Sequence, residues 1–152
     1  MRDLPDCARI ALRLLSVDKE CWRAHMKMRI LIADDCPAFR EFLKSFVALV
    51  PDTSVAGEAA DGEEATQLVR RLKPDLVLMD IDMPRMDGFE ATRRIKAHRR
   101  QTKIVLLSAS DDDDSTTGAA DSGADAFLPK STPLPILIAA IQRVVSNHAR
   151  GR

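Results

Sequence analysis

Short apolar runs alternate with longer amphipathic segments along most of the chain, which predicts strands alternating with helices. Five runs have the length and apolar content of strands: 28–33, 54–58, 76–79, 103–107 and 126–129. The run 54–58 is the weakest of them, whereas 76–79 reads as a fully buried strand. Polar residues follow four of the five runs, and these positions matter for function below.

Helical spacing fills the intervals between the runs. The helices are expected to begin near Pro37, after a cap at Asp61, at Gly88, in the acidic run 111–114, and after a cap at Thr132. The helix after Asp111 contains small residues and Gly118, so it should be short and mobile. Predicted inner faces are Phe39, Phe42, Leu43, Phe46, Leu49 and Val50 for the first helix, and Leu134, Leu137, Ile138, Ile141, Val144 and Val145 for the last.

This alternation predicts an α/β fold with a parallel sheet, right-handed crossovers and helices on both faces. The expected arrangement is a flavodoxin-like doubly wound sheet of five strands in the order 2-1-3-4-5, with five helices. We expect three parts: an N-terminal extension over 1–27, forming a short docking helix or a loosely attached or disordered leader, one domain over 28–147, and a tail over 148–152.

Composition narrows the classes of partner. The chain of 152 residues has 23 Lys and Arg against 23 Asp and Glu, so no global field attracts it to nucleic acid or an anionic membrane. Three cysteines without CxxC spacing suggest neither a disulfide framework nor a zinc site. No apolar stretch reaches the roughly 20 residues of a membrane span. A cytoplasmic location fits these features.

Polar residues at the strand ends form a chemically coherent set. Asp34 and Asp35 follow the first strand, Asp80 the third, Ser108 the fourth and Lys130 the fifth. In the predicted strand order these positions are adjacent and converge on one shallow pocket. Three neighbouring carboxylates repel one another unless cations compensate, and Mg²⁺ with a lysine would meet that need.

Such a pocket is suited to phosphoryl transfer. Asp80 would attack phosphorus and form an acyl phosphate, while Mg²⁺ and Lys130 neutralise the phosphoryl oxygens and Ser108 donates a hydrogen bond. The sequence contains no Walker loop for ATP, so the donor must carry its own activated phosphoryl group.

The same residues resemble the site of a two-component response-regulator receiver domain. Asp34-Asp35, Asp80 in LVLMDIDMPRMDG, Ser108 in VLLSAS and Lys130 in AFLPKS match it over residues 28 to about 147. The local sequences are most similar to the subfamily that usually carries a C-terminal helix-turn-helix output domain. This chain ends after the last predicted helix, so we expect a stand-alone or truncated receiver without direct DNA binding.

The resemblance implies a phosphorylation cycle. A phosphohistidine of a sensor histidine kinase or a phosphotransfer protein donates to Asp80, with the main-chain carbonyl of Asp82 joining the acids around Mg²⁺. Ser108 then moves toward the phosphoryl group and Phe127 turns inward. These movements change the face made by the helix after Asp111, the strand 126–129 and the last helix. A downstream protein, a missing output domain or a second copy of the chain would read that face.

Two alternatives remain open. An aspartyl-phosphate hydrolase of the haloacid dehalogenase type shares the Asp80-Ile81-Asp82 pattern, but its nucleophile strand comes first and its paired acids last. An unphosphorylated scaffold is the other, although the intact acid, hydroxyl and lysine set gives it little support. We expect a phosphoacceptor signalling domain with slow self-dephosphorylation at most, and not an enzyme.

Overall fold

The structure, a computed structural model, describes residues 27–109 and 113–150. Almost all of the predicted extension over 1–27 therefore lies outside the described residues, as do Cys7, Cys21, the start of the acidic run at Asp111 and the last two residues. The side chains of residues 113–116 and 145–150 are likewise outside the description.

Five parallel strands form one sheet in the order β2-β1-β3-β4-β5. This confirms the predicted fold class and strand order. The strand bounds agree with the apolar runs to within one residue at each end: β1 Met28–Ala33, β2 Thr53–Ala59, β3 Leu76–Asp80, β4 Lys103–Ser108 and β5 Ala126–Pro129.

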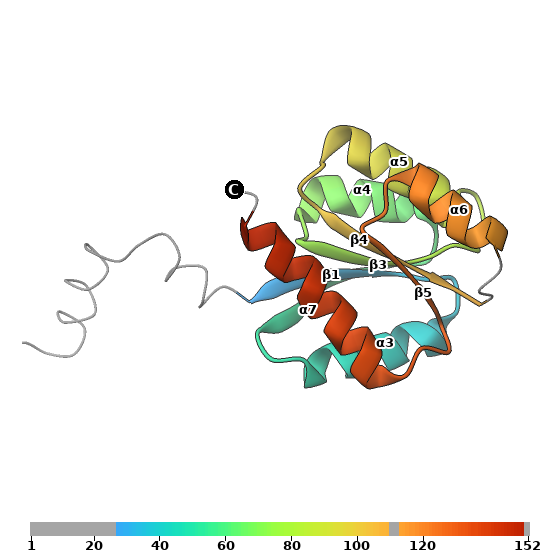
Figure 1. Ribbon diagram of the computed structural model, residues 1–152. Helices are drawn as coiled ribbons and strands as arrows, with labels where there is room; N and C mark the ends of the chain where they lie inside the picture. Colours follow the sequence, from blue (N-terminus) through green and yellow to red (C-terminus); the bar gives the residue numbers. More distant parts are fainter. Residues whose placement is uncertain (1–26, 110–112, 151–152) are drawn as a thin grey trace, which may run out of the picture.

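Helices cover both faces of the sheet. Two of them, α3 and α7, lie on one face, and α4, α5 and α6 lie on the other (Figure 1). The helices are α3 Pro37–Leu49, α4 Gly62–Leu72, α5 Gly88–His98, α6 Asp113–Ser122 and α7 Leu134–Arg150. The last helix begins one residue later than Pro133 and runs past the predicted boundary at 147.

Alternate strand residues supply two separate cores. Ile30 and Ile32 of β1 pack in the cluster shared with α3 and α7, whereas Leu31 and Ala33 pack in the cluster shared with α4, α5 and α6. Every residue of β3 is buried, as expected for a central parallel strand with helices on both sides. The sheet is thus a rigid platform whose carboxyl-terminal edge holds the polar residues.

Side-chain caps fix the starts of two helices near that edge. The Asp61 carboxylate accepts a hydrogen bond from the Glu64 amide at 2.8 Å, and the Glu64 carboxylate accepts one from the Ala60 amide. Asp87 caps α5 through the Glu90 amide at 2.7 Å. The predicted Asp61 cap is confirmed.

Parts of the predicted inner faces were wrong. Phe42 is 43% exposed, Leu49 is 72% exposed and Leu134 is 37% exposed. In α3 the buried stripe follows Leu43, Phe46 and Val47, so Phe42 and Leu49 lie on its border and face solvent. Phe42 and Leu49 are seven positions apart, and this spacing marked the edge of the buried stripe rather than its centre.

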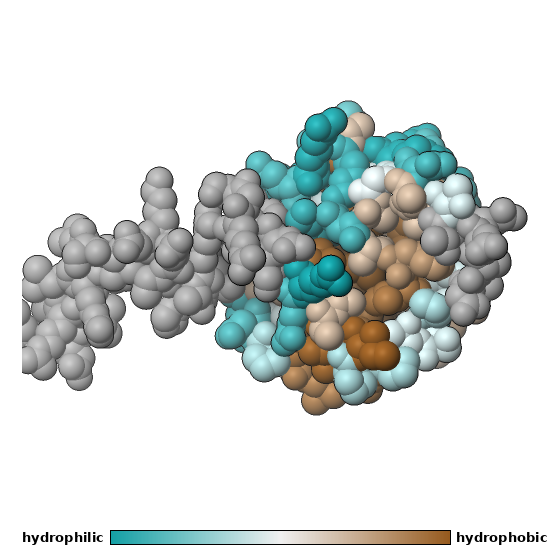
Figure 2. Space-filling view, in the orientation of Figure 1, coloured by the Kyte–Doolittle hydropathy of each residue, from teal (hydrophilic) through white to brown (hydrophobic). Residues whose placement is uncertain are grey.

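Exposed apolar side chains also gather on the face that carries α7 and β5 (Figure 2). A groove on this face is lined by residues of β5 and α7, among them Leu128, Ile136 and Val144. Ile136 is 54% exposed. Within the described residues, no helix combines the length and apolar content that crossing a bilayer requires.

Candidate functional site

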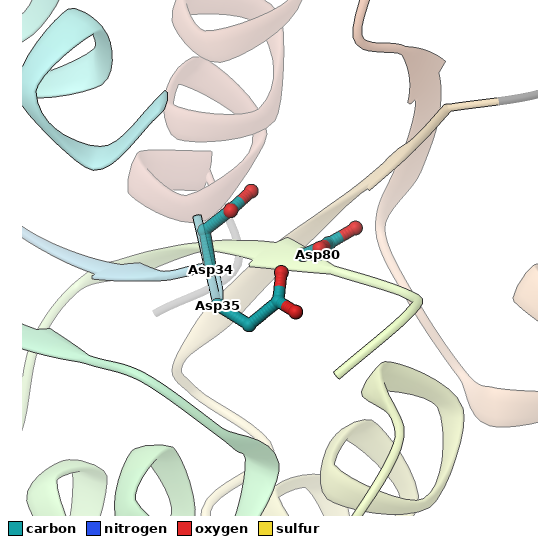
Figure 3. A group of neighbouring side chains, drawn as sticks. All are labelled: Asp34, Asp35 and Asp80. Atoms are coloured by element: carbon teal, nitrogen blue, oxygen red, sulfur yellow. The ribbon is translucent and has the colours of Figure 1, made fainter. Parts of the chain in front are cut away.

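Four neighbouring strands end at one edge of the sheet, and a polar residue closes or follows each. Asp34 follows β1, Asp80 and Ser108 end β3 and β4, and Lys130 follows β5. Figure 3 shows Asp34 and Asp35 beside the end of β1 with Asp80 at the end of β3 next to them. The edge is where open α/β sheets bind ligands.

The three carboxylates lie close together. One oxygen from each of Asp34, Asp35 and Asp80 lies within 4.8 Å of the others. Asp34 is fully buried and Asp80 is 2% exposed, whereas Asp35 faces solvent. Two buried acids at this separation repel each other, so the cluster requires positive charge.

Lys130 supplies part of that charge. Its Nζ lies 2.7 Å from Asp34 Oδ2 and 3.0 Å from Asp80 Oδ2. The Lys130 amide donates to the Ser108 carbonyl at 2.6 Å, which fixes the start of the loop after β5. The Phe39 ring of α3 lies 4.7 Å from Nζ and covers the ammonium through a cation–π contact.

The net pKa values of Asp80 and Lys130 are both raised, but from different causes. Burial raises the pKa of Asp80 from 3.8 to about 6, with a contribution from the Asp34 charge, although the contact with Lys130 opposes the rise. Burial lowers the pKa of Lys130, but its contacts with Asp34 and Asp80 outweigh this and the net pKa is raised. The lysine therefore remains charged at neutral pH, and Asp80 is costly to ionise in the absence of further cations.

Asp34 is held by its backbone as well as its side chain. Its Oδ1 accepts a hydrogen bond from the Cys36 amide at 2.8 Å, and its carbonyl accepts one from the Arg40 guanidinium at 2.6 Å. Arg40 Nε also lies 3.5 Å from Glu58 Oε2. Sequence reasoning missed Arg40 and Phe39, because neither contact follows a local spacing rule.

The carboxylate cluster fits a cation. Asp34 Oδ2 is buried and has the Lys130 ammonium 2.7 Å away as an ion-pair partner. One ammonium offsets only part of the charge of three neighbouring carboxylates, so the cluster can accept a further cation. Two or three carboxylates without histidine or cysteine form a ligand set of the kind that Mg²⁺ prefers.

The loop after β3 adjoins the carboxylates. The Asp82 amide lies 3.3 Å from Asp80 Oδ1, and the Gly88 amide donates to the Ile81 carbonyl at 2.8 Å. A Cβ atom at Gly88 would lie only 2.1 Å from the Asp80 carbonyl oxygen. Glycine at 88 is therefore required for α5 to begin this close to Asp80.

Ser108 and Phe127, the other two residues predicted for the site, lie at different distances from the carboxylate edge. Ser108 is 1% exposed and ends the strand next to β3, at the same edge as the carboxylates. Phe127 lies further back on β5, beside Leu106 in the sheet, and packs against the core under α4, α5 and α6. It does not belong to the carboxylate cluster.

Comparison with known proteins gives a family match. The sequence profile of the response regulator receiver domain matches residues 30–142. The chain is 37% identical over 123 residues to the transcriptional regulatory protein DegU of Brevibacillus brevis, covering 81% of this chain and 52% of that protein. It is 47% identical over 107 residues to protein-glutamate methylesterase/protein-glutamine glutaminase 4 of Myxococcus xanthus, covering 70% of this chain and 30% of that protein.

A solved structure of a response regulator is similar to this chain in fold. The two-component response regulator of the LuxR family from Aurantimonas sp. SI85-9A1 superposes with a TM-score of 0.75 at 32% identity, covering 78% of this chain and 85% of that one. The chain spans from about a third to just over half the length of these two curated relatives.

Proposed function

Since this chain belongs to the response regulator receiver domain family and therefore to two-component signalling, we propose that Asp80 is its phosphoacceptor. The observation that carries this proposal is the contact of one ammonium with two buried carboxylates. Lys130 Nζ lies 2.7 Å from Asp34 and 3.0 Å from Asp80, with Asp35 in the same cluster. Receiver domains bind Mg²⁺ through acidic residues of this kind.

In the proposed reaction a carboxylate oxygen of Asp80 attacks the phosphorus of a phosphohistidine. The new O–P bond gives an acyl phosphate, the P–N bond breaks, and the histidine leaves as neutral imidazole after taking up a proton. Lys130 pairs with the transferred phosphoryl group, and the Ser108 hydroxyl donates a hydrogen bond to it.

Asp34, Asp35, Asp80 and the main-chain carbonyl of Asp82 are the proposed ligands of Mg²⁺. When bound, the ion would neutralise charge on the carboxylates and on the phosphoryl oxygens. The clustering of three carboxylates around a single ammonium supports this assignment.

The switch proposed for the chain involves the face of α6, β5 and α7. Contact of Ser108 with phosphate favours one conformation over another, and Phe127 turning inward carries the change to this face. Phe127 lacks a hydroxyl, so its effect is steric. In the structure it is partly buried against the core beside Leu106 of β4.

The proposed partners follow from the family match and from the proposed phosphoryl transfer. A sensor histidine kinase or a phosphotransfer protein supplies the phosphoryl group in the cytoplasm. A downstream protein, an output domain or a second copy of the chain reads the α6–β5–α7 face. The groove between β5 and α7, which the exposed Ile136 helps to line, supports such contacts. Direct binding to DNA or to a membrane is not part of the proposal.

We further propose that residues 28–147 act as a phosphoacceptor domain and not as an enzyme with its own substrate, with 1–27 and 148–152 as flanking segments. The family match does not favour the hydrolase of the haloacid dehalogenase type. It covers residues 30–142, within the proposed domain.

Labelling by acetyl phosphate tests the proposal. With Mg²⁺ present, wild type is expected to gain one phosphoryl group by intact-mass analysis, and Asp80→Asn is expected to gain none. A variant that still labels at the wild-type rate would show that Asp80 is not the acceptor.

A matched control comes from the same segment. Asp87→Asn removes an exposed carboxylate but keeps a side chain that can cap α5. It should label like wild type, which separates loss of the acceptor from loss of a nearby negative charge.

A further inference from the structure

Arg85 has an unusual backbone conformation in the loop 81–87 between β3 and α5. Its φ angle is +64°, in the left-handed region that residues with a Cβ atom rarely adopt. Such a conformation persists where surrounding contacts hold it. The Arg85 side chain is 66% exposed, so core packing is not what holds it.

Two contacts hold Arg85: the Met86 amide donates to the Pro84 carbonyl across it at 2.7 Å, and its side chain forms an ion pair with Asp61. Its guanidinium pairs with Asp61 Oδ2, and the Asp61 side chain is only 1% exposed. The other oxygen, Oδ1, caps α4 through the Glu64 amide. Asp61 therefore joins the start of α4 to the loop that follows β3, with each oxygen committed to one of them.

Backbone contacts reinforce the same junction. The Gly62 amide donates to the Met86 carbonyl at 3.1 Å, and a Cβ atom at Gly62 would lie 2.3 Å from that oxygen. The Thr66 hydroxyl lies 3.8 Å from Met86 Sδ. The loop thus rests directly on the first turn of α4, and Arg85 closes this contact from the solvent side.

This loop carries the Asp82 carbonyl, and the Asp82 amide contacts Asp80 Oδ1. We propose that the Arg85–Asp61 ion pair is a latch that positions the 81–87 loop for metal binding, an inference that rests on the proposed magnesium site. Arg85 is a positioning residue, because its guanidinium pairs with Asp61 and acts on the metal site only through the loop.

Four substitutions isolate the ion pair. Arg85→Ala removes the guanidinium and keeps the strained backbone, whereas Arg85→Gly removes the guanidinium and relieves the strain. Arg85→Lys keeps a cation. Asp61→Asn keeps an oxygen that can cap α4 but removes the charge. Arg93→Ala is the matched control, because Arg93 forms an exposed ion pair with Glu90 on α5.

Three measurements on the full chain separate positioning from general stability. They are amide hydrogen exchange of the 81–87 loop without metal, the Mg²⁺ dissociation constant by calorimetry, and urea unfolding. Loss of outer-shell support weakens metal binding by about 10-fold or more. Arg85→Ala, Arg85→Gly and Asp61→Asn should therefore raise the dissociation constant about 10-fold and speed exchange in the loop.

Arg85→Lys should stay closer to wild type, and Arg93→Ala should match wild type in all three measurements. Saturating Mg²⁺ should restore the rate of labelling by acetyl phosphate in Arg85→Ala. Wild-type Mg²⁺ affinity in Arg85→Ala and Asp61→Asn would overturn the latch. Wild-type behaviour of Arg85→Gly would also overturn it, because the backbone conformation alone would then position the loop.

The outcomes also distinguish the latch from the proposed function. A wild-type chain that binds Mg²⁺ but is not labelled by acetyl phosphate would overturn the phosphoacceptor role alone. A wild-type chain that binds no Mg²⁺ would overturn the latch as a device for metal binding.

Discussion

Replacing Asp80 by asparagine should stabilise the metal-free protein at neutral pH. Burial raises the pKa of Asp80 from 3.8 to about 6, so the folded chain holds the Asp80 proton more tightly than the unfolded chain. The protonated form therefore stabilises the fold fully below pH 3.8, and this contribution is lost as pH rises through about 6. Above that range the buried charge is a cost.

The pKa of Asp80 is 3.8 in the unfolded chain and about 6 in the folded chain. At about 1.36 kcal/mol for each pKa unit, this difference in proton affinity contributes about 3 kcal/mol to the free energy of unfolding. The asparagine side chain of the variant resembles the protonated acid in shape and charge, so Asp80→Asn should gain up to about 3 kcal/mol at pH 7.5. The gain should become small near pH 4, where the wild-type carboxyl is protonated in the folded state and partly protonated in the unfolded state, and vanish below pH 3.8.

Urea unfolding in the presence of a chelator, at pH 7.5 and near pH 4, measures both differences. Added Mg²⁺ should then stabilise wild type more than the variant, since the ion binds the charged carboxylates. Equal stability of the two proteins at pH 7.5 would refute the reasoning that burial of the Asp80 charge is costly, as would a gain that persists unchanged near pH 4.

Three further changes test other parts of the description. Lys130→Ala should uncouple phosphorylation from the structural response, so that acetyl phosphate changes the amide spectrum of wild type but much less that of the variant; identical changes would contradict this. Leu43→Ala should cost about 2–5 kcal/mol in urea unfolding because Leu43 is fully buried, whereas Phe42→Ala at a 43% exposed position should cost much less; equal losses would contradict the assigned buried stripe. Ile136→Asp should leave labelling of Asp80 intact and weaken self-association of the phosphorylated chain in sedimentation, and unchanged association would remove the groove from the proposal.

The fold was predictable because each element carries a local signal. The apolar runs of β1 and β3 end at acids, and proline and cap residues mark where the helices start or stop. Adjacent parallel strands then bring Asp34, Asp80 and Lys130 to one edge without further information. That step depends only on strand order, and the structure confirms the strand order.

Contacts between distant segments were not predictable from the pattern. The Arg85–Asp61 pair needs the loop after β3 to rest on the start of α4, and the sequence signalled only the capping role of Asp61. Phe39 packs against the core as expected, but the contact of its ring with the Lys130 ammonium was not foreseen. The exposure of Leu49 depends on how α3 is rotated on the sheet, which hydrophobic spacing fixes only approximately.

Chemical trapping of the acyl phosphate tests the central claim most directly. Borohydride reduces an aspartyl phosphate to homoserine, and peptide mass spectrometry then locates the modified residue. After treatment with acetyl phosphate and Mg²⁺, homoserine is expected at position 80 and at no other acid of the cluster. Homoserine at position 34 or 35, or at none of the three, would contradict the assignment of Asp80 as the phosphoacceptor.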